Sequence, residues 1–183
     1  MLYYVTSLLK LDEGMSTLFF VVMTALSVLF YPMVMKLTPK YGKKKLILVA
    51  FCIFIVAFTY TACLGLMTFI PATVQGLILC VLAAPAMAIF GILPQAVVAD
   101  IAQCDEMETN ENRAGMFYAA RTFAMKMGQA VAMIVVASLA IVGKETGVGY
   151  RLTAVVAAAA CAIGGLIFSR YNEKRIYDRI IGK

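Results

Sequence analysis

The sequence predicts an all-α polytopic membrane protein, and three observations support this class. The 183 residues are 63% hydrophobic and only 14% charged, whereas soluble domains are about 45–50% apolar and about 25% charged. Five stretches are apolar over the roughly 20 residues that a helix needs to cross a bilayer. Most Lys and Arg residues lie in the short segments that separate or flank these stretches, a pattern typical of the cytosolic loops of membrane proteins.

The five predicted transmembrane helices differ in character. The first two are uncharged, and the third is long and contains Pro85 and Pro94. Kinked helices of that kind often line transport cavities, although ordinary bending is the alternative. The fourth span holds Arg121 and Lys126. In chain order the spans are Met15–Met35, Leu46–Leu66, Ala72–Ala99, Met116–Val142 and Val148–Ser169.

The start of the chain, "MLYYVTSLL", is apolar but too short to cross a membrane. We expect it to be the remnant of a sixth helix whose beginning the chain lacks, with a short anchoring helix as the alternative. The chain then divides into a half-bundle over residues 1–170 and a basic cytosolic tail over residues 171–183.

The distribution of basic residues predicts the orientation. The segments "KLTPKYGKKK" and "RYNEKRIYDRIIGK" and Arg113 together hold eleven Lys and Arg residues, against three on the opposite side. Because such residues favour the cytosol, we expect a multi-pass protein of the inner or plasma membrane. Its N-terminus would lie outside and its C-terminus in the cytosol.

The composition argues against several classes of function. The chain has no histidine, which removes the usual proton shuttle and the commonest metal ligand. Its five cysteines form no CxxC pair, and their expected role is that of small buried hydrophobic residues. The net charge of +6 is explained by the cytosolic loops without a nucleic-acid partner. The sequence therefore predicts neither an enzyme nor a protein with a bound cofactor or metal.

An acidic segment follows the third span. Five acids lie in the twelve residues from Asp100 to Glu111, with Arg113 as the nearest basic residue. We expect a cytosolic loop whose acids pair with basic residues of other cytosolic segments, or else simply a solvated loop. Arg121, one turn into the next span, is expected to pair with an acid such as Asp100.

Lys126 lies about ten residues into the fourth span, so roughly 15 Å deep. A charged group at that depth costs roughly 2.5–3.5 kcal/mol to insert, so its side chain should face a polar cavity or a carboxylate. Thr122 and Gln129 share its helix face at offsets of four and three residues. This polar stripe favours a substrate path over a purely structural lysine.

The segment from Pro94 to Ala130 resembles the region joining helices ten and eleven of the glycoside–pentoside–hexuronide:cation symporters, the melibiose permease-like branch of the major facilitator superfamily. "YGKKK" and "LYY" resemble the turn between helices eight and nine and the end of helix seven. The family pattern has a proline, "AD", "DYDEW", a basic residue, "G.FY" and "K.GQA". Here it reads Pro94, Ala99–Asp100, Asp105–Glu106, Arg113, Gly115–Phe117–Tyr118 and Lys126–Gly128–Gln129–Ala130.

The resemblance implies a fold of twelve helices in two halves, of which this chain would be the C-terminal half. It implies cation-coupled symport of a sugar, glycoside or hexuronide by alternating access, driven by Na⁺ or H⁺. The cation site would lie mainly in the missing N-terminal half-bundle, which becomes an expected partner beside the sugar and the lipid bilayer. A truncated, non-transporting membrane remnant or subunit is the alternative.

The resemblance also assigns residues. Lys126 would line the sugar cavity with Thr122 beside it, and Gln129 completes the stripe. Ion pairs that break and re-form at a cytosolic gate would involve Asp100, Asp105, Glu106, Arg113 and Arg121. The chain departs from the pattern at Cys104 and Met107, where tyrosine and tryptophan are usual. Gly91 stands where some sugar-transporting members have a cavity aromatic, which leaves the substrate open.

Overall fold

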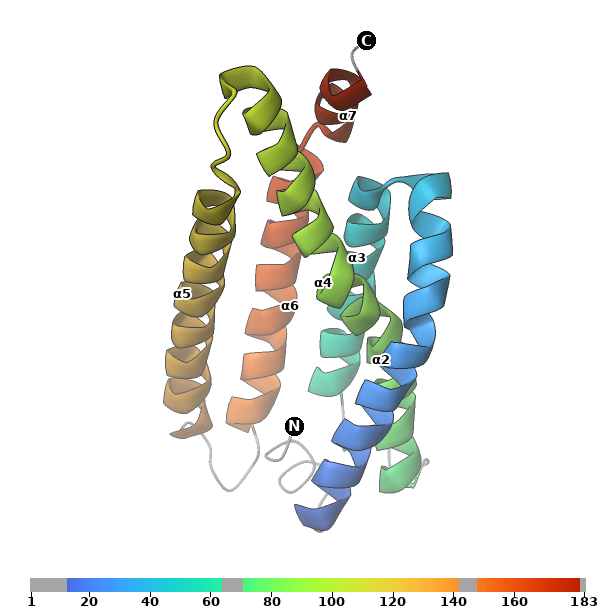
Figure 1. Cartoon of the computed structure of the whole chain (residues 1–183). Helices are drawn as coiled ribbons and strands as arrows, with labels where there is room; N and C mark the ends of the chain where they lie inside the picture. Colours follow the sequence, from blue (N-terminus) through green and yellow to red (C-terminus); the bar gives the residue numbers. More distant parts are fainter. Residues whose placement is uncertain (1–12, 64–70, 142–147, 182–183) are drawn as a thin grey trace.

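A computed structural model of the chain describes residues 13–63, 71–141 and 148–181 (Figure 1). Within these ranges every regular element is a helix, and five helices are long and apolar enough to cross a membrane. The predicted all-α polytopic class is therefore confirmed. The helices are α2 (Glu13–Tyr41), α3 (Lys43–Ala62), α4 (Ala72–Thr109), α5 (Ala114–Ile141), α6 (Val148–Ser169) and α7 (Glu173–Ile181).

The helices that match the predicted spans are mostly longer than predicted. α6 has the bounds that the sequence predicts, whereas α2 continues to Tyr41 and α4 to Thr109. The basic tail, whose structure the sequence left open, forms the helix α7. Three predicted features lie outside the described residues. They are the apolar N-terminal stub, the end of the second span at Leu66 and the end of the fourth span at Val142.

The predicted acidic loop from Asp100 is wrong for most of its length. α4 continues to Thr109 because no glycine or proline stands between residues 95 and 109, and Ala, Gln, Glu and Met favour a helix. The helix ends at Asn110, whose backbone is left-handed with φ 56° and whose N–H donates to the Glu106 carbonyl at 2.9 Å. Such a residue is a common helix terminator. The acids up to Glu108 are thus held on a helix in fixed positions.

The two prolines of the third predicted span lie inside one continuous helix. Pro85 and Pro94 are both interior to α4, which spans 38 residues. Proline removes one backbone donor each time, and in a membrane neighbouring helices help to satisfy the carbonyls that it frees. α4 therefore runs through the bundle as a single long element.

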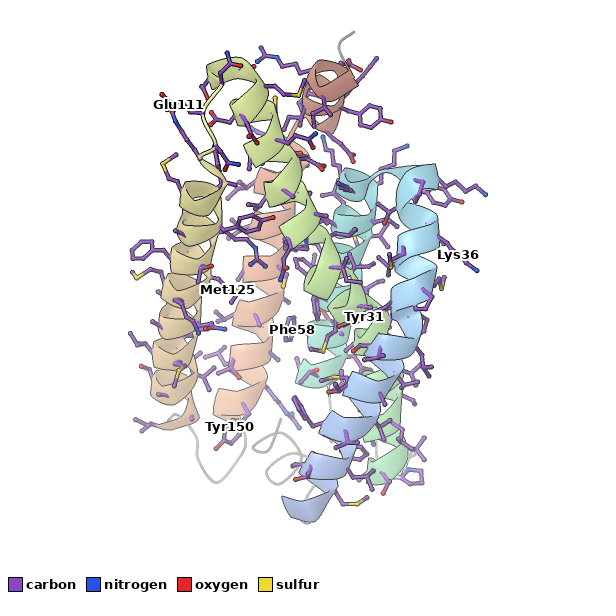
Figure 2. All side chains as sticks on the ribbon, in the orientation of Figure 1. Tyr31, Lys36, Phe58, Glu111, Met125 and Tyr150 are labelled. Carbon is purple, nitrogen blue, oxygen red and sulfur yellow. The ribbon has the colours of Figure 1, made fainter. Side chains whose placement is uncertain are left out.

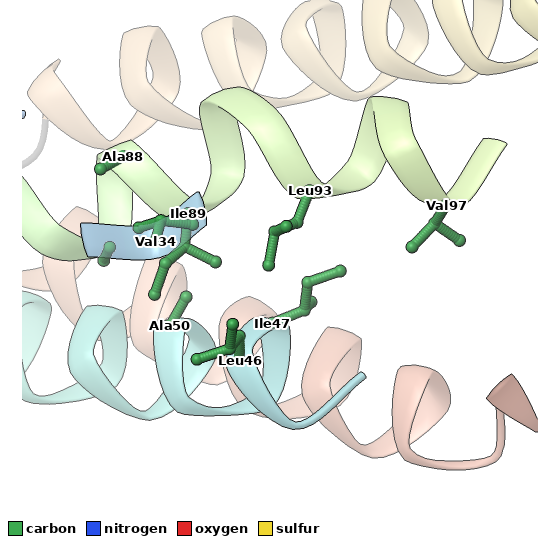
Figure 3. Close-up of a cluster of buried hydrophobic side chains, with 9 residues drawn as sticks. Val34, Leu46, Ile47, Ala50, Ala88, Ile89, Leu93 and Val97 are labelled. Atoms are coloured by element: carbon green, nitrogen blue, oxygen red, sulfur yellow. The ribbon is translucent and has the colours of Figure 1, made fainter. Parts of the chain in front are cut away.

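The core lies where α3 and α4 pack together, with α2 and α6 on their outer sides. The most extensive contacts join α3 to α6, α2 to α4 and α3 to α4. Figure 3 shows the largest buried cluster, in which small and branched side chains interlock between the helices. Its buried members are Val34, Leu46, Ile47, Ala50, Ala86, Ala88, Ile89, Leu93 and Val97.

A glycine allows α2 and α4 to approach closely. Phe19 of α2 is fully buried, and a Cβ at Gly76 of α4 would lie 2.6 Å from its ring. No real side chain tolerates that distance, so the contact requires glycine. The Cys80 thiol, also on α4, donates to the Phe19 carbonyl at 3.4 Å.

α5 lies at the edge of the bundle (Figure 1). It contacts α6 and the end of α4, yet none of its residues is buried. Met125, labelled on this helix in Figure 2, is 46% exposed. A helix with mean hydropathy suited to a membrane and no buried face requires lipid or further protein around it.

Candidate substrate and gating sites

The ion pairs of the described chain all lie at one end of the bundle, which is formed by the α2–α3 turn, the last turns of α4, the α4–α5 connection and α7 (top of Figure 1). We call this region the charged end. α2 and α3 are joined there by Gly42 alone, whose φ of 83° suits glycine. The predicted tight turn at Gly42 is therefore present, and it places the amino end of α3 beside α4 and α7.

The first interaction of the charged end joins α3 to α4. The Lys43 ammonium lies 2.6 Å from a carboxylate oxygen of Asp100, and both side chains are about three-quarters buried, at 25% and 30% exposure. Partial burial reduces solvent screening and makes such a pair stronger than one on an open surface. Asp100 thus pairs with a basic residue of the "YGKKK" turn, as expected of this acidic segment. The pair expected with Arg121 is not formed.

The second interaction joins α7 to α3. The carboxylate of Glu173 accepts the backbone N–H groups of Lys43 at 2.6 Å and Lys44 at 3.0 Å. These amides belong to the first turn of α3 and have no partner within the helix. A carboxylate there also meets the positive end of the helix dipole. Glu173, which is distant in sequence, therefore caps α3.

Gly42 makes this cap possible in a second way. A Cβ at Gly42 would lie 2.9 Å from a carboxylate oxygen of Glu173. Any other residue would push the carboxylate away, besides straining the backbone at φ 83°. A third interaction, the ion pair of Arg179 with Glu108, joins α7 to α4. We call the set Lys43, Asp100, Glu108, Glu173 and Arg179 the clasp.

Three members of the clasp, Lys43, Asp100 and Glu173, line a cavity of about 660 Å³ between the α2–α3 turn, α4 and α7. Tyr171 also lines this cavity, just before α7. Burial raises the pKa of Tyr171 to about 12, and the negative charges of Asp100, Glu173 and Cys104 act in the same direction. The Tyr171 phenol therefore keeps its proton to a higher pH than an ordinary tyrosine does.

The other residues predicted for the gate differ in their burial and in whether they have a partner. Glu106 is exposed on α4, and Arg113 pairs with the nearby Glu111 at 2.6 Å, also at the surface. One carboxylate oxygen of Asp105 is shut off from the surroundings without a hydrogen-bond partner in the described part of the chain. Arg121 is half-buried on α5, and none of the ion pairs within the described ranges includes it.

The predicted substrate stripe lies on α5. Thr122, Lys126 and Gln129 are all exposed, and the Thr122 hydroxyl donates to the Tyr118 carbonyl at 2.8 Å. Lys126 forms none of the ion pairs seen among the described residues. The three side chains share one helix face, so the stripe is continuous but no other helix of the described chain covers it.

Sequence reasoning missed part of the clasp. Glu173 and Arg179 were grouped into a basic tail, although Glu173 stands in the first turn and Arg179 in the last turn of a short helix. The signal was the i, i+4 spacing of Ile176 and Ile180 in that tail, which is typical of a helix with one apolar face. Glu108 was counted within the acidic segment but was not singled out.

The fold and these sites define a polytopic membrane protein with charged side chains at one end and a polar stripe on the surface of one transmembrane helix. The chain belongs to the major facilitator family described as "MFS/sugar transport protein", which it matches over residues 1–171. Transport of a sugar is thus the activity of its class. None of the curated proteins and none of the solved structures matches the chain significantly. The described residues hold no group of three acidic or Cys side chains suited to a metal.

Proposed function

We propose that the chain is the C-terminal half-bundle of a cation-coupled sugar symporter, with α5 lining the substrate cavity. The observation that carries the proposal is the uncovered stripe of Thr122, Lys126 and Gln129. Lys126 lies twelve residues after the start of α5, which is about 18 Å along the helix. Lipid at that depth would leave an ammonium group unsolvated. A water-filled cavity completed by other helices provides the solvation and a place for a hydroxyl-rich substrate.

The exposure of α5 supports the same proposal. α5 offers no buried residue to the rest of the chain, so a second half-bundle has a full helix face to cover. The charged end would face the cytosol, since the basic residues gather there. Na⁺ or H⁺ would bind mainly in the second half-bundle, because the described residues hold no acidic cluster within the membrane.

The clasp would act as part of the cytosolic gate. Asp100 is satisfied by Lys43 within the chain, whereas Asp105 has an oxygen shut off without a partner and Arg121 has no ion pair here. Glu106 and Arg121 are therefore the residues most open to a second half-bundle when the gate closes, whereas Arg113 would first have to leave Glu111 and Asp105 would have to turn its buried oxygen outward. Opening the gate would break those pairs together with the pair of Asp100 and Lys43.

Uptake into proteoliposomes tests the proposal. The chain is purified with the half-bundle encoded upstream in the same or an adjacent reading frame, and radiolabelled hexoses, pentoses and hexuronates are offered under Na⁺ or H⁺ gradients. We expect Lys126→Ala to lower sugar uptake about 10- to 100-fold, since it removes a charged hydrogen-bond donor. Lys126→Arg should retain part of the activity.

Met125→Ala is the matched control, because Met125 is the exposed neighbour on another face of α5. It should leave uptake unchanged. Unaltered uptake and binding in Lys126→Ala would refute the cavity assignment. The chain without its second half should not transport, and the absence of any upstream half-bundle would instead favour a non-transporting remnant or subunit.

A further inference from the structure

Four exposed side chains form a stripe along α2 that runs toward the charged end. They are Leu29, Met33, Lys36 and Lys40, and each lies three or four residues after the one before it. This spacing places them within about 60° of one another around the helix, over a length of about 16 Å. The stripe passes from two apolar side chains to two lysines, and we call it the outer stripe. This order is typical of a helix face that leaves the hydrocarbon region of a membrane.

The outer stripe lies opposite the side of α2 that packs on the bundle. Ser27 and Val34 are the buried residues in this half of α2, and they lie about 140–160° around the helix from Leu29. Val34 belongs to the largest buried cluster, which residues of α3 and α4 complete. Lys36, labelled in Figure 2, is exposed. The residues that the structure describes therefore leave the outer stripe open to a membrane or to further protein.

The lysines of the outer stripe have no acid at hand. The sequence holds no Asp or Glu between Glu13 and Asp100, and the Asp100 carboxylate is bonded to Lys43. None of the ion pairs among the described residues includes Lys36 or Lys40. Two lysines four residues apart on one helix face repel each other. An anion shared between the two ammonium groups would replace this repulsion by attraction.

We propose that the outer stripe binds an anionic phospholipid, with the lipid phosphate held between Lys36 and Lys40. Both ammonium groups end long apolar stems and can rise from the helix to the level of the headgroups. One acyl chain lies along Met33 and Leu29. The ring of Tyr41, 5.6 Å from the Lys40 ammonium, stands at the same end, and tyrosine is enriched at that level of a membrane. In the orientation proposed above this is the cytosolic leaflet, which carries the anionic lipids.

An anionic phospholipid matches both ends of the outer stripe. A zwitterionic headgroup brings an ammonium group of its own, which the two lysines repel. A protein helix on the stripe would have to offer an apolar face to Leu29 and a carboxylate between Lys36 and Lys40. A phospholipid carries its acyl chain and its phosphate in one molecule, in the order in which the stripe presents their partners. Contact of an acyl chain with Met33 therefore separates the lipid from a protein partner.

Fluorescence quenching by brominated lipids measures this contact. The chain contains no tryptophan, so Met33→Trp places a single fluorophore on the outer stripe, and Leu29→Trp gives a second reporter one turn away. Each variant is reconstituted into phosphatidylcholine vesicles in which a fixed fraction of the lipid carries brominated acyl chains. The brominated lipid is either phosphatidylglycerol or phosphatidylcholine. We expect phosphatidylglycerol to bind beside Met33→Trp with about five- to tenfold the affinity of phosphatidylcholine, and high salt to reduce this ratio.

Removal of the two stripe charges should abolish the preference. In the Met33→Trp chain, Lys36→Gln together with Lys40→Gln should bring the ratio of the two affinities close to one. Lys45→Gln together with Arg170→Gln is the matched control, because it removes two exposed positive charges from the same end of the bundle but none from the stripe. That control should keep the preference for phosphatidylglycerol.

Three results would overturn the proposal. Equal quenching by the two brominated lipids would show that the outer stripe has no preference for an anionic headgroup. An equal loss of preference in the two double variants would show that the charged end attracts anionic lipid in general and that the stripe is no site. Absence of quenching by either lipid, at both reporters, would show that protein such as a second copy of the chain covers the stripe.

Discussion

Helices α4 and α5 follow one another in the chain, yet the tertiary structure treats them differently. Both have membrane hydropathy, but half of the most apolar window of α4 is buried and none of that of α5. On α4, Asp100 finds Lys43 and Glu108 finds Arg179, whereas Arg121 and Lys126 of α5 pair with no described residue. α4 is thus held by contacts within the described chain, whereas those residues leave every part of α5 unburied.

This difference predicts that substitutions on α4 change stability and those on α5 change function. The largest effect is expected at Gly76. Gly76→Leu would drive a side chain into Phe19, which overpacks the contact of α2 with α4. We expect the free energy of unfolding to fall by about 3 kcal/mol, measured by SDS-induced unfolding in mixed micelles.

Gly128→Leu on α5 is the matched control, because nothing lies within 4 Å of a Cβ there. It should change the free energy of unfolding by less than about 0.5 kcal/mol. Equal destabilisation by the two substitutions would contradict the contrast between α4 and α5.

The cap that Glu173 places on α3 is expected to give the next largest effect. Glu173→Ala leaves the amides of Lys43 and Lys44 without their acceptor. We expect a loss of about 1–2 kcal/mol and faster hydrogen exchange at these two amides. Glu106→Ala, an exposed acid on α4, should do neither. Unchanged exchange at Lys43 and Lys44 in the Glu173 variant would disprove the cap.

The pair of Lys43 and Asp100 is expected to contribute less. Both side chains keep about a quarter of their exposure, so screening limits the interaction. Lys43→Met, Asp100→Asn and the double variant should give a coupling of about 1 kcal/mol in unfolding experiments. Arg121→Gln combined with Asp100→Asn should show no coupling in the chain alone. A sizeable Arg121 coupling there would mean that the observed pairing is wrong.

The smallest effect concerns pH. The pKa of Tyr171 is raised to about 12 in the folded chain, against the ordinary 10.0. Between these values the unfolded chain has lost the proton that the folded chain retains, so stability should fall as pH rises from 10 to 12. Tyr171→Phe should flatten that slope. Tyrosinate absorbance gives the direct measurement, since the variant should lack the late titration that Tyr171 contributes.

Sequence reasoning located the helices well and the interactions poorly. Val148–Ser169 was predicted to the residue, because apolar length is a local property. The end of α4 was misjudged, since charge alone suggested a loop although no glycine or proline stands between residues 95 and 109. Lys126 was singled out from its depth, which is also local. No other described helix covers Lys126, so its role stays a prediction.

By itself the sequence determined which segments cross the membrane and that the basic residues gather between them. It also placed Thr122, Lys126 and Gln129 on one helix face. These follow from composition and helical periodicity, which act over a few turns. Only the tertiary structure decided that Asp100 pairs with Lys43, 57 residues away, and that Glu173 caps a helix 130 residues earlier. Such partners are set by how whole helices pack, because only packing brings distant charges within bonding distance.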